Sequence, residues 1–181
     1  MKAIVQRVLS ASVTVDSELI SSISKGLLVF AAVGPDDDES DAVNMAGRVL
    51  KMKFWDDEEG GRWKKNVVDI GGEILCVSQF TLLANTKKGS KPDFHGAMEP
   101  EKAKALYDAF FKRVQQDYQP EKVKDGVFQA MMQVALVNDG PVTLELNTPE
   151  KKPKVQKIVD KKAKIKGSET PGSSSQASET V

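Results

Sequence analysis

The chain has 181 residues, of which 40% are hydrophobic and 29% are charged. These values are ordinary for a globular domain, so they exclude a wholly disordered chain, a collagen-like repeat and a disulfide scaffold. The single cysteine, Cys76, cannot form an intramolecular disulfide, and the single histidine, His95, excludes a multi-histidine metal cluster. We therefore expect one domain of ordinary size that holds neither a metal ion nor another cofactor.

The formal net charge of zero conceals two oppositely charged parts. Residues 150–181 carry eight lysines and four acidic residues, a net charge of +4, so the remainder, with 18 basic and 22 acidic residues, carries −4. Around Asn147 to Pro149, alternating apolar residues give way to a segment rich in lysine and then in serine. We expect a folded domain over residues 1–148 and a basic, serine-rich, disordered tail over 149–181. Nucleic-acid binding by the domain would need a local basic patch.

Membrane association is not expected. No apolar run approaches the roughly 18 residues that a membrane span requires. The longest run, Leu27–Val33, lies between Gly26 and Gly34-Pro35. Met1–Ile4 has the pattern of a strand and lacks the apolar segment of a signal peptide. These features predict a cytoplasmic protein that makes no membrane contact.

The first fifty residues show strand patterns followed by one helix. Four strands are expected, over Lys2–Leu9, Ser12–Asp16, Leu19–Ile23 and Gly26–Val33. Four acidic residues at positions 36–39 then precede an apolar stripe with helical spacing, formed by Val43, Ala46, Val49 and Leu50. Because acidic residues stabilise a helix N-terminus, a helix is expected here.

The remaining elements alternate between strand and helix. An apolar run over Glu73–Ala84, preceded by glycine-rich turns, is expected to form a central, buried strand. Pro100 suits the first position of a second helix, whose apolar residues recur at helical spacing: Ala103, Leu106, Tyr107, Phe110 and Val114. Two strands, Val127–Val137 and Val142–Leu146, are expected to be joined through residues 138–141. Two helices on a mostly β body predict an α/β or α+β fold.

Two groups of residues near the centre of the chain have side chains suited to chemistry. Cys76 and His95 have the side chains of a nucleophile and a base. However, Cys76 lies within an apolar segment, where cysteine usually packs as a small hydrophobic residue. Ser78-Gln79-Phe80-Thr81 places three hydrogen-bonding side chains in the expected central strand. Buried polar groups need partners, so this cluster indicates either a ligand site or an internal network.

A third group, Asn138–Thr143, contains the dipeptide Gly140-Pro141. The proline bond can be cis or trans, and either isomer gives a stiff turn that aims its carbonyl groups. Taken alone, the segment is better read as an ordinary hairpin connection than as a functional motif.

Five separated segments, taken together and in order, resemble the eukaryotic type of the D-aminoacyl-tRNA deacylase (D-tyrosyl-tRNA deacylase) family. They are Val5–Val8 with Ala11–Val15, Gly26–Val29, Val77–Leu82, Lys91–His95 and Asn138–Thr143. The resemblance covers about residues 1–148, and the tail lies outside it. With it we expect an α/β fold, specifically a three-layer α/β/β sandwich-like domain with two helices on a mostly β body.

The resemblance also implies a function. Members are two-fold homodimers that hydrolyse the ester of D-aminoacyl-tRNA to free amino acid and tRNA and reject L-aminoacyl-tRNA. Their Gly-Pro motif, here Gly140-Pro141, carries a cis bond and enters the partner subunit's pocket as a chirality filter. Such a filter excludes an L side chain by steric contact, so glycine should pass, and Gly-tRNA is expected as a second substrate.

The matching segments supply the expected site residues. Ser78, Gln79, Phe80 and Thr81 face the terminal adenosine and the ester carbonyl, where backbone N–H groups around Phe80 and Thr81 stabilise an oxyanion. In the family the terminal 2′-hydroxyl of the tRNA is thought to activate water, so Thr81 is assigned to positioning, with a nucleophilic Thr81 as the alternative. The expected substrate-binding residues are Arg7, which anchors the Gly-Pro loop, Phe128 and Met132 at the adenine, and Lys87, Lys88 and Lys91 at the tRNA backbone.

Simpler readings remain beside each of these assignments. Core packing explains Phe128 and Met132 equally well, a surface ion pair explains Arg7, and a solvated loop explains the three lysines. A non-catalytic nucleic-acid-binding module that acts through the lysine-rich tail is the alternative function, but it leaves the polar segment at Ser78–Thr81 unexplained. An oligomeric interaction protein would leave both motifs unexplained.

Overall fold

The computed structural model describes residues 1–87 and 89–149. Residues 1–149 form one compact unit. The predicted tail lies, from residue 150 onward, outside the described residues, as does Lys88. No helix in the described part of the chain is both long enough and apolar enough to cross a membrane.

One mixed sheet organises the domain, with β1 (Lys2–Val15) at its centre. The strand order is β2 (Glu18–Ile23), β1, β3 (Gly26–Ala32), β4 (Glu73–Ser78) and β5 (Val123–Asp125), and β6 (Gln133–Asn147) pairs with β1. Pairs that include β1 are antiparallel, whereas β3, β4 and β5 run parallel to one another. The carboxyl ends of these three parallel strands therefore meet at one edge of the sheet.

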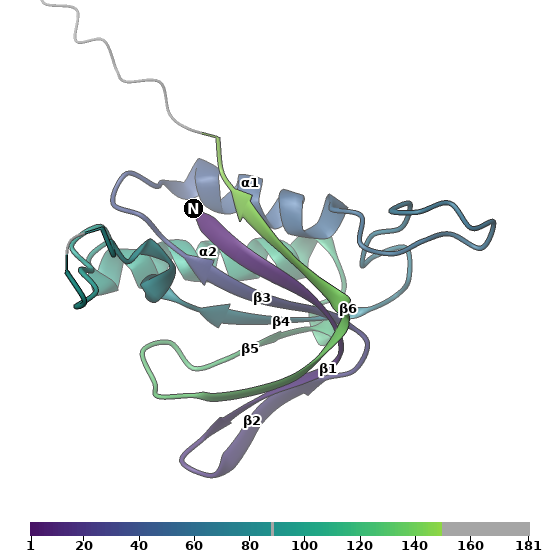
Figure 1. Cartoon of the computed structure of the whole chain (residues 1–181), viewed down its shortest axis with the longest axis horizontal. Helices are drawn as coiled ribbons and strands as arrows, with labels where there is room; N and C mark the ends of the chain where they lie inside the picture. Colours follow the sequence, from purple (N-terminus) through teal and green to yellow (C-terminus); the bar gives the residue numbers. More distant parts are fainter. Residues whose placement is uncertain (88, 150–181) are drawn as a thin grey trace, which may run out of the picture. The chain divides into compact units, whose positions relative to one another are not determined.

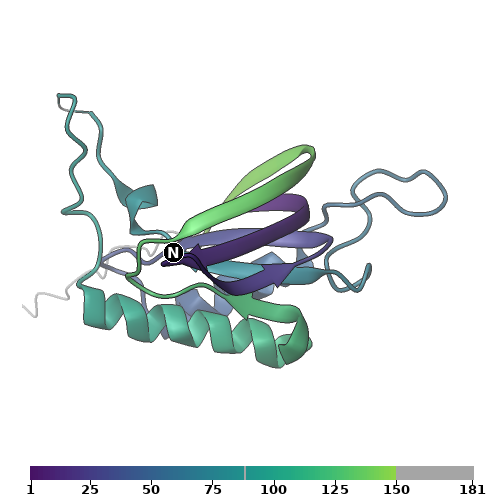
Figure 2. The same ribbon diagram turned by 90° about the horizontal axis from the view of Figure 1, so that it is seen from below.

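Two helices cover one face of this sheet (Figures 1 and 2). α1 (Glu39–Lys51) begins at the N-cap residue Asp38, which accepts from the backbone N–H groups of Ser40 and Asp41, while Asp41 accepts from the N–H of Asp38. This reciprocal capping box explains why the acidic run starts a helix. α2 (Pro100–Asp117) has proline at its first position and buries Tyr107, Phe110 and Val114, as the helical spacing predicted.

The main core lies between the helices and the sheet. It is built from fully buried apolar side chains of both layers and of the segment after α1, which contributes Phe54. Those from the helices and the sheet include Val5, Leu27, Val29, Met45, Val49, Ile74, Phe110 and Val114. A smaller buried cluster, which includes Val8, Val13, Leu28, Leu75 and Val77, lies apart from it. Large apolar side chains of β1 and β6, such as Leu9, Leu136 and Val137, stay exposed.

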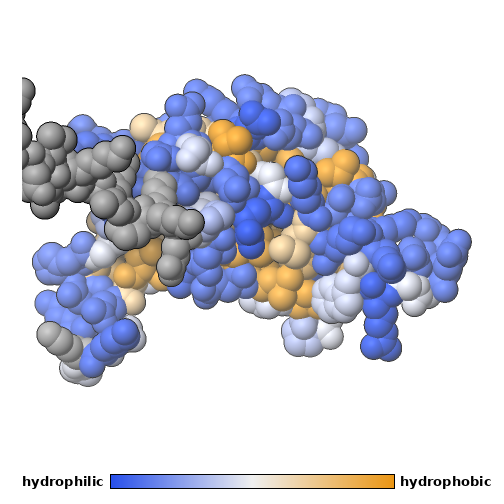
Figure 3. Space-filling view, turned by 90° about the horizontal axis from the view of Figure 1, so that it is seen from above, coloured by the Kyte–Doolittle hydropathy of each residue, from blue (hydrophilic) through white to orange (hydrophobic). Residues whose placement is uncertain are grey.

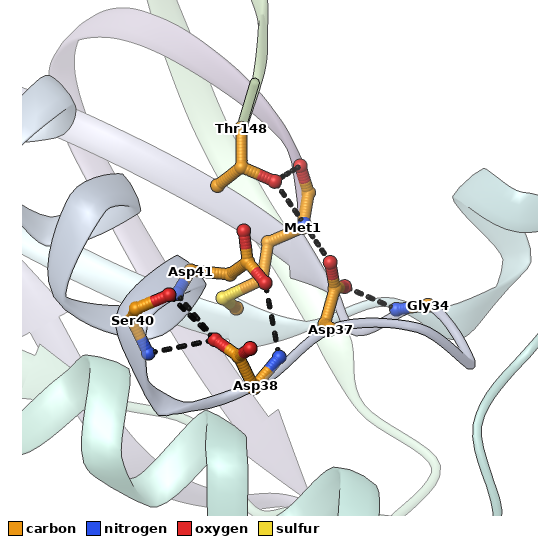
Figure 4. Close-up of polar contacts among 7 residues, drawn as sticks. All are labelled: Met1, Gly34, Asp37, Asp38, Ser40, Asp41 and Thr148. Atoms are coloured by element: carbon orange, nitrogen blue, oxygen red, sulfur yellow. Dashed lines mark hydrogen bonds and ion pairs between the residues drawn. The ribbon is translucent and has the colours of Figure 1, made fainter. Parts of the chain in front are cut away.

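Polar contacts tie the first residue to the start of α1 (Figure 4). The α-amino group of Met1 donates to Asp37 Oδ1 and to Thr148 Oγ1, each at 2.5 Å. Asp37 Oδ2 in turn accepts from the N–H of Gly34 at 2.6 Å. The contacts join β1, the turn after β3 and the end of β6, so they fix the carboxyl end of β3, where the site described below lies.

Three sequence expectations about strands were wrong in detail, and one strand was missed. Lys2–Leu9 and Ser12–Asp16 form one strand, β1, because β6 pairs along both halves. Val127–Val137 and Val142–Leu146 likewise belong to one strand, β6, which begins only at Gln133. The run over Glu73–Ala84 leaves the sheet after Ser78, and the three-residue strand β5 was missed. Both helices were predicted correctly, and the α/β class is confirmed as two helices on a mixed sheet.

Candidate active site

The polar segment predicted in the central strand lies at that strand's end. Ser78 is the last residue of β4, and the N–H of Gln79 donates to the carbonyl of Ala31 at 2.8 Å, which ends the pairing with β3. Phe80–Leu83 then forms one turn of 3-10 helix, η1. Phe80 is 55% exposed, and Thr81 is also exposed. The chain therefore leaves the sheet after Ser78, and the polar residues that follow do not lie on the two faces of a strand.

A cavity of about 970 Å³ opens at this edge of the sheet. Its wall combines the ends of β3 and β4, the start of α2 and the loop between β5 and β6. Six of the predicted site residues line it: Ser78, Gln79, Phe80, Thr81, Phe128 and Met132. The volume is at the upper end of the range for small-molecule and cofactor sites. The structure thus joins two groups of residues that lie about fifty positions apart in the sequence.

Phe128 and Met132 reach the cavity from a loop, although the sequence placed them in a strand. Residues 126–132 turn tightly: Gln129 has a φ of +63° and the N–H of Ala130 donates to the carbonyl of Val127 at 3.2 Å. The Phe128 ring lies 5.9 Å from the Tyr107 ring, and Lys104 Nζ lies 5.9 Å from its centroid. These contacts hold the Phe128 ring in the cavity wall.

Tyr107 and Asp125 support this aromatic wall. The sequence analysis expected Tyr107 in the buried stripe of a helix, but it gave neither residue a role in the site. Tyr107 is buried in α2, and its hydroxyl donates to Asp125 Oδ1 at 2.6 Å; the same oxygen accepts from the N–H of Gly126 at 2.8 Å. Burial raises the pKa of Asp125 and raises that of the Tyr107 hydroxyl well above its usual value. A tyrosine in a buried helical stripe needs a hydrogen-bond partner, which was the available signal.

Asp125→Asn is expected to leave the protein at least as stable as the wild type at pH 7. The raised pKa means that the ionised form of Asp125 is disfavoured in the folded state, so its ionisation lowers the free energy of unfolding. This loss of stability is absent below the pKa of Asp125 in the unfolded chain and complete above its pKa in the folded protein. Asparagine keeps Oδ1 as the acceptor for Tyr107 and Gly126. The measurement is urea unfolding at pH 7 and pH 4. The free energy of unfolding of Asp125→Asn, relative to that of the wild type, should be higher at pH 7 than at pH 4.

Tyr107→Phe is the matched comparison, because it removes the hydroxyl that donates to Asp125 Oδ1 and leaves that oxygen with one donor fewer. It should lower the free energy of unfolding by about 1–3 kcal/mol at pH 7. An Asp125→Asn protein that is less stable than Tyr107→Phe at pH 7 would contradict the assigned acceptor role.

Gly140 and Pro141 form an anchored, exposed bulge in β6. Their peptide bond is cis. Residues 139–142 lie opposite Arg7, between the pairs Gln6–Thr143 and Val8–Asn138. Arg7 Nε donates to the carbonyl of Asp139 at 3.0 Å and lies 3.1 Å from its carboxylate, while Arg7 Nη1 donates to the carbonyl of Phe54 at 2.5 Å. Arg7 thus contacts the residue before the dipeptide. Neither Gly140 nor Pro141 lines the cavity of its own chain.

Two of the predicted tRNA-binding lysines, Lys87 and Lys91, lie beside the cavity rather than in it. Lys87 and Lys91 are exposed on the loop that follows η1, where Asn85 and Asp93 pair through their backbones. Phe94 in the same loop packs edge-on against Phe80, with ring centroids 5.2 Å apart, and this contact joins the loop to the cavity wall.

Cys76 and His95 do not form a catalytic pair. Cys76 is fully buried in β4, and burial, with Asp125 nearby, raises the pKa of its thiol well above the usual value, so a thiolate is disfavoured. The His95 side chain is 97% exposed and pairs with Asp93 in its own loop. Within residues 1–87 and 89–149, no group of three or more His, Cys, Asp or Glu side chains is placed to hold a metal ion.

The fold and the cavity define an α/β domain with a large cavity at the ends of parallel strands, lined in part by aromatic side chains. The family model of D-Tyr-tRNA(Tyr) deacylase matches residues 4–147. D-aminoacyl-tRNA deacylase of Yarrowia lipolytica is 52% identical over 155 residues, which cover 84% of this chain and all of the relative. D-aminoacyl-tRNA deacylase 1 of Homo sapiens is 48% identical over 149 residues, which cover 82% of this chain and 71% of the relative. The chain belongs to the D-Tyr-tRNA(Tyr) deacylase family.

Two solved structures share the fold of this chain. One named "c-Myc DNA Unwinding Element Binding Protein" is 47% identical and superposes with a TM-score of 0.79, covering 83% of this chain and all of that chain. A second, "Structural Analysis of a probable eukaryotic D-amino acid tRNA deacylase", has a TM-score of 0.67 at 16% identity, covering 80% and 97%. The second comparison concerns the fold alone.

Proposed function

We propose that this protein is a D-aminoacyl-tRNA deacylase, an editing hydrolase that cleaves the ester between a D-amino acid and the terminal adenosine of tRNA. The observation that carries the proposal is the cavity, which brings the Ser78–Thr81 segment together with Phe128 and Met132 in a chain that belongs to this family. The aromatic wall suits the adenine, and the polar strand end suits the ester.

The chemistry proposed for this site relies on positioning. An aminoacyl ester is already labile, so correct placement and oxyanion stabilisation supply much of the acceleration. The first N–H groups of a helical turn have no acceptor within the turn, and the Gln79 side chain does not cap η1. The backbone N–H groups of Phe80 and Thr81 are therefore the proposed oxyanion donors. The terminal 2′-hydroxyl of the tRNA would activate the attacking water.

Thr81 is assigned to positioning rather than to nucleophilic attack. Its Oγ1 accepts from the Gln79 side-chain amide at 2.5 Å. An amide N–H is a donor and cannot remove the proton from the hydroxyl, so this contact does not activate Thr81 as a nucleophile. The contact orients the hydroxyl at the cavity.

The proposed active form is a two-fold homodimer with the three-layer α/β/β arrangement. Support comes from Leu9 and Val137, each 52% exposed on β1 and β6, because exposed apolar side chains on a sheet favour burial against a second copy. Gly140-Pro141 is exposed and lies outside its own cavity, so it is free to enter the partner's and reject L side chains there. Glycine lacks the excluded side chain, and Gly-tRNA is the proposed second substrate.

Other parts of the proposal concern the tRNA body. Lys87, Lys88 and Lys91 would contact its backbone, and the basic tail would add electrostatic attraction. We place this activity in the cytoplasm. A non-catalytic nucleic-acid-binding module acting through the tail is the competing proposal, and the assay below separates the two.

The test is deacylation of D-Tyr-tRNA, L-Tyr-tRNA and Gly-tRNA by the full-length protein. The D and glycyl esters should be hydrolysed faster than the L ester by at least about a hundredfold. Thr81→Val should keep activity within about tenfold, since a nucleophile's loss costs about a thousandfold or more. Equal rates for D-Tyr-tRNA and L-Tyr-tRNA, or binding without hydrolysis, would refute the proposed function.

A further inference from the structure

A second large groove lies at the opposite end of α2 from the active-site cavity. Its volume is about 1040 Å³, and its wall comes from the second half of α1, the last turns of α2 and the loop after α1. We name it the α1/α2 groove and define it by Arg48, Lys51, Lys53, Trp63 and Arg113. Figure 3 looks onto the side of the molecule where α1 lies, a mostly hydrophilic surface with separate hydrophobic patches.

The charge of the α1/α2 groove is opposite to that of the domain. Four basic side chains line it, against a single carboxylate, Asp117, which Arg113 Nε contacts at 2.7 Å. Among the described residues, Arg48, Lys51 and Lys53 make no ion pair, and Arg48 Nε is buried without a hydrogen-bond partner. Residues 1–149 together carry a net charge of −4. A local positive site on an acidic body attracts a polyanion to one place.

An exposed indole lies among these cations. Trp63 is 49% exposed, although most large apolar side chains of the domain are buried. The backbone of Trp63 has a φ of +55°, and its backbone N–H donates to Asp56 Oδ1 at 3.0 Å. This hydrogen bond fixes the loop backbone at Trp63. Val43 and Val68, which are also exposed, line the groove beside it. Cations combined with an exposed aromatic ring are typical of surfaces that bind nucleic-acid backbone and stack on sugars or unpaired bases.

α2 connects the groove to the active-site cavity. Pro100 and Tyr107 line the cavity, and Arg113 and Asp117 line the groove. The fourteen residues from Pro100 to Arg113 span about 20 Å along the helix. At about 3.4 Å per nucleotide along one strand of a duplex, a separation of this size corresponds to about six nucleotides of a bound nucleic acid.

We propose that the α1/α2 groove is a second contact for the substrate tRNA and binds its phosphodiester backbone while the terminal nucleotide occupies the active-site cavity. The proposal rests on the proposed function, because the polyanion is the substrate named there. Lys51 and Lys53 neutralise phosphates, and Trp63 packs against the adjoining sugar or base. The groove raises the affinity for tRNA and takes no part in ester cleavage or in selection between D and L.

The experiment compares a long and a short substrate. Lys51→Glu and Lys53→Glu are each measured in the full-length protein with D-Tyr-tRNA and with D-tyrosyl-adenosine, which lacks the tRNA body. Each variant should lower kcat/KM for D-Tyr-tRNA by about threefold to tenfold at low salt and reduce the salt slope by about one. The rate with D-tyrosyl-adenosine and the preference for D over L should not change. Lys25→Glu, on the exposed turn between β2 and β3, is the control with the same change in net charge.

Two further measurements complete the test. Trp63→Ala leaves the net charge unchanged and should raise the KM for D-Tyr-tRNA by about fivefold, because it removes the aromatic face on which a sugar or base packs. Equilibrium binding of deacylated tRNA tests the groove separately: if wild-type protein binds tRNA through Lys51 and Lys53 but hydrolyses no ester, only the proposed function fails.

Three results would overturn the groove proposal. One is an equal loss with D-tyrosyl-adenosine, which would mean that the substitutions act through the fold. Another is an equal loss in Lys25→Glu, which would reflect net charge alone. The third is binding of polyglutamate as tight as that of tRNA, equally weakened by Lys51→Glu, which would assign the groove to an acidic protein partner.

Discussion

Gly140→Ala is expected to lower the rate of D-Tyr-tRNA hydrolysis by about a hundredfold and to weaken the rejection of L-Tyr-tRNA. A Cβ at this position would lie 2.7 Å from Val142 Cγ2, 3.0 Å from the Val142 backbone nitrogen and 3.1 Å from Arg7 Nη2. The φ of +134° is also unfavourable for any side chain. The loop must move, and the contacts of Arg7 with Asp139 move with it. Single-turnover rates with both esters measure the effect.

Gly60→Ala is the matched control for Gly140→Ala. Gly60 also has a positive φ, +83°, but nothing lies within 4 Å of a Cβ built there. This variant should lose some stability and keep both the rate and the selectivity. If Gly140→Ala hydrolyses D-Tyr-tRNA at the wild-type rate and still rejects the L ester, the chirality filter must lie elsewhere.

Phe128→Ala is expected to raise the KM for D-Tyr-tRNA by about tenfold or more, with kcat changed by less than about threefold. The half-buried ring lines the cavity and packs against Tyr107, and its loop position lies outside the fully buried core, so the fold should survive its removal. Steady-state kinetics and competition by adenosine 5′-monophosphate, which should also bind about tenfold more weakly, provide the measurements.

Phe128→Tyr supplies the control, because it retains an aromatic face. This variant should have a KM for D-Tyr-tRNA within about threefold of the wild-type value. A Phe128→Ala enzyme with an unchanged KM and a reduced kcat would place this ring at the reacting ester instead of at the adenine.

Local patterns were sufficient for the helices and insufficient for the strands. The run of acids before α1 and the proline at the start of α2 act within one helical turn, so they can be recognised without knowledge of the rest of the fold. Strand limits depend on distant partners. β4 ends at Ser78 because β3 ends beside it, and β5 has only three residues because they pair with β4 alone. No nearby residue signals either limit.

The candidate active site likewise has some features that the sequence predicts and others that depend on the tertiary structure. The sequence by itself determined the family, through motifs in order, and the residue types at the polar strand end and at Gly140-Pro141. For Arg7, Phe128 and Met132 the sequence suggested a place in the site but left simpler readings open. The tertiary structure brought Phe128 and Met132 to the same cavity as Ser78–Thr81 and set Arg7 against the residue before Gly140. The bond between Tyr107 and Asp125 came from the tertiary structure alone. The reason is physical: parallel pairing of β3, β4 and β5 brings three chain segments to one edge, and side-chain packing across that edge depends on all three at once.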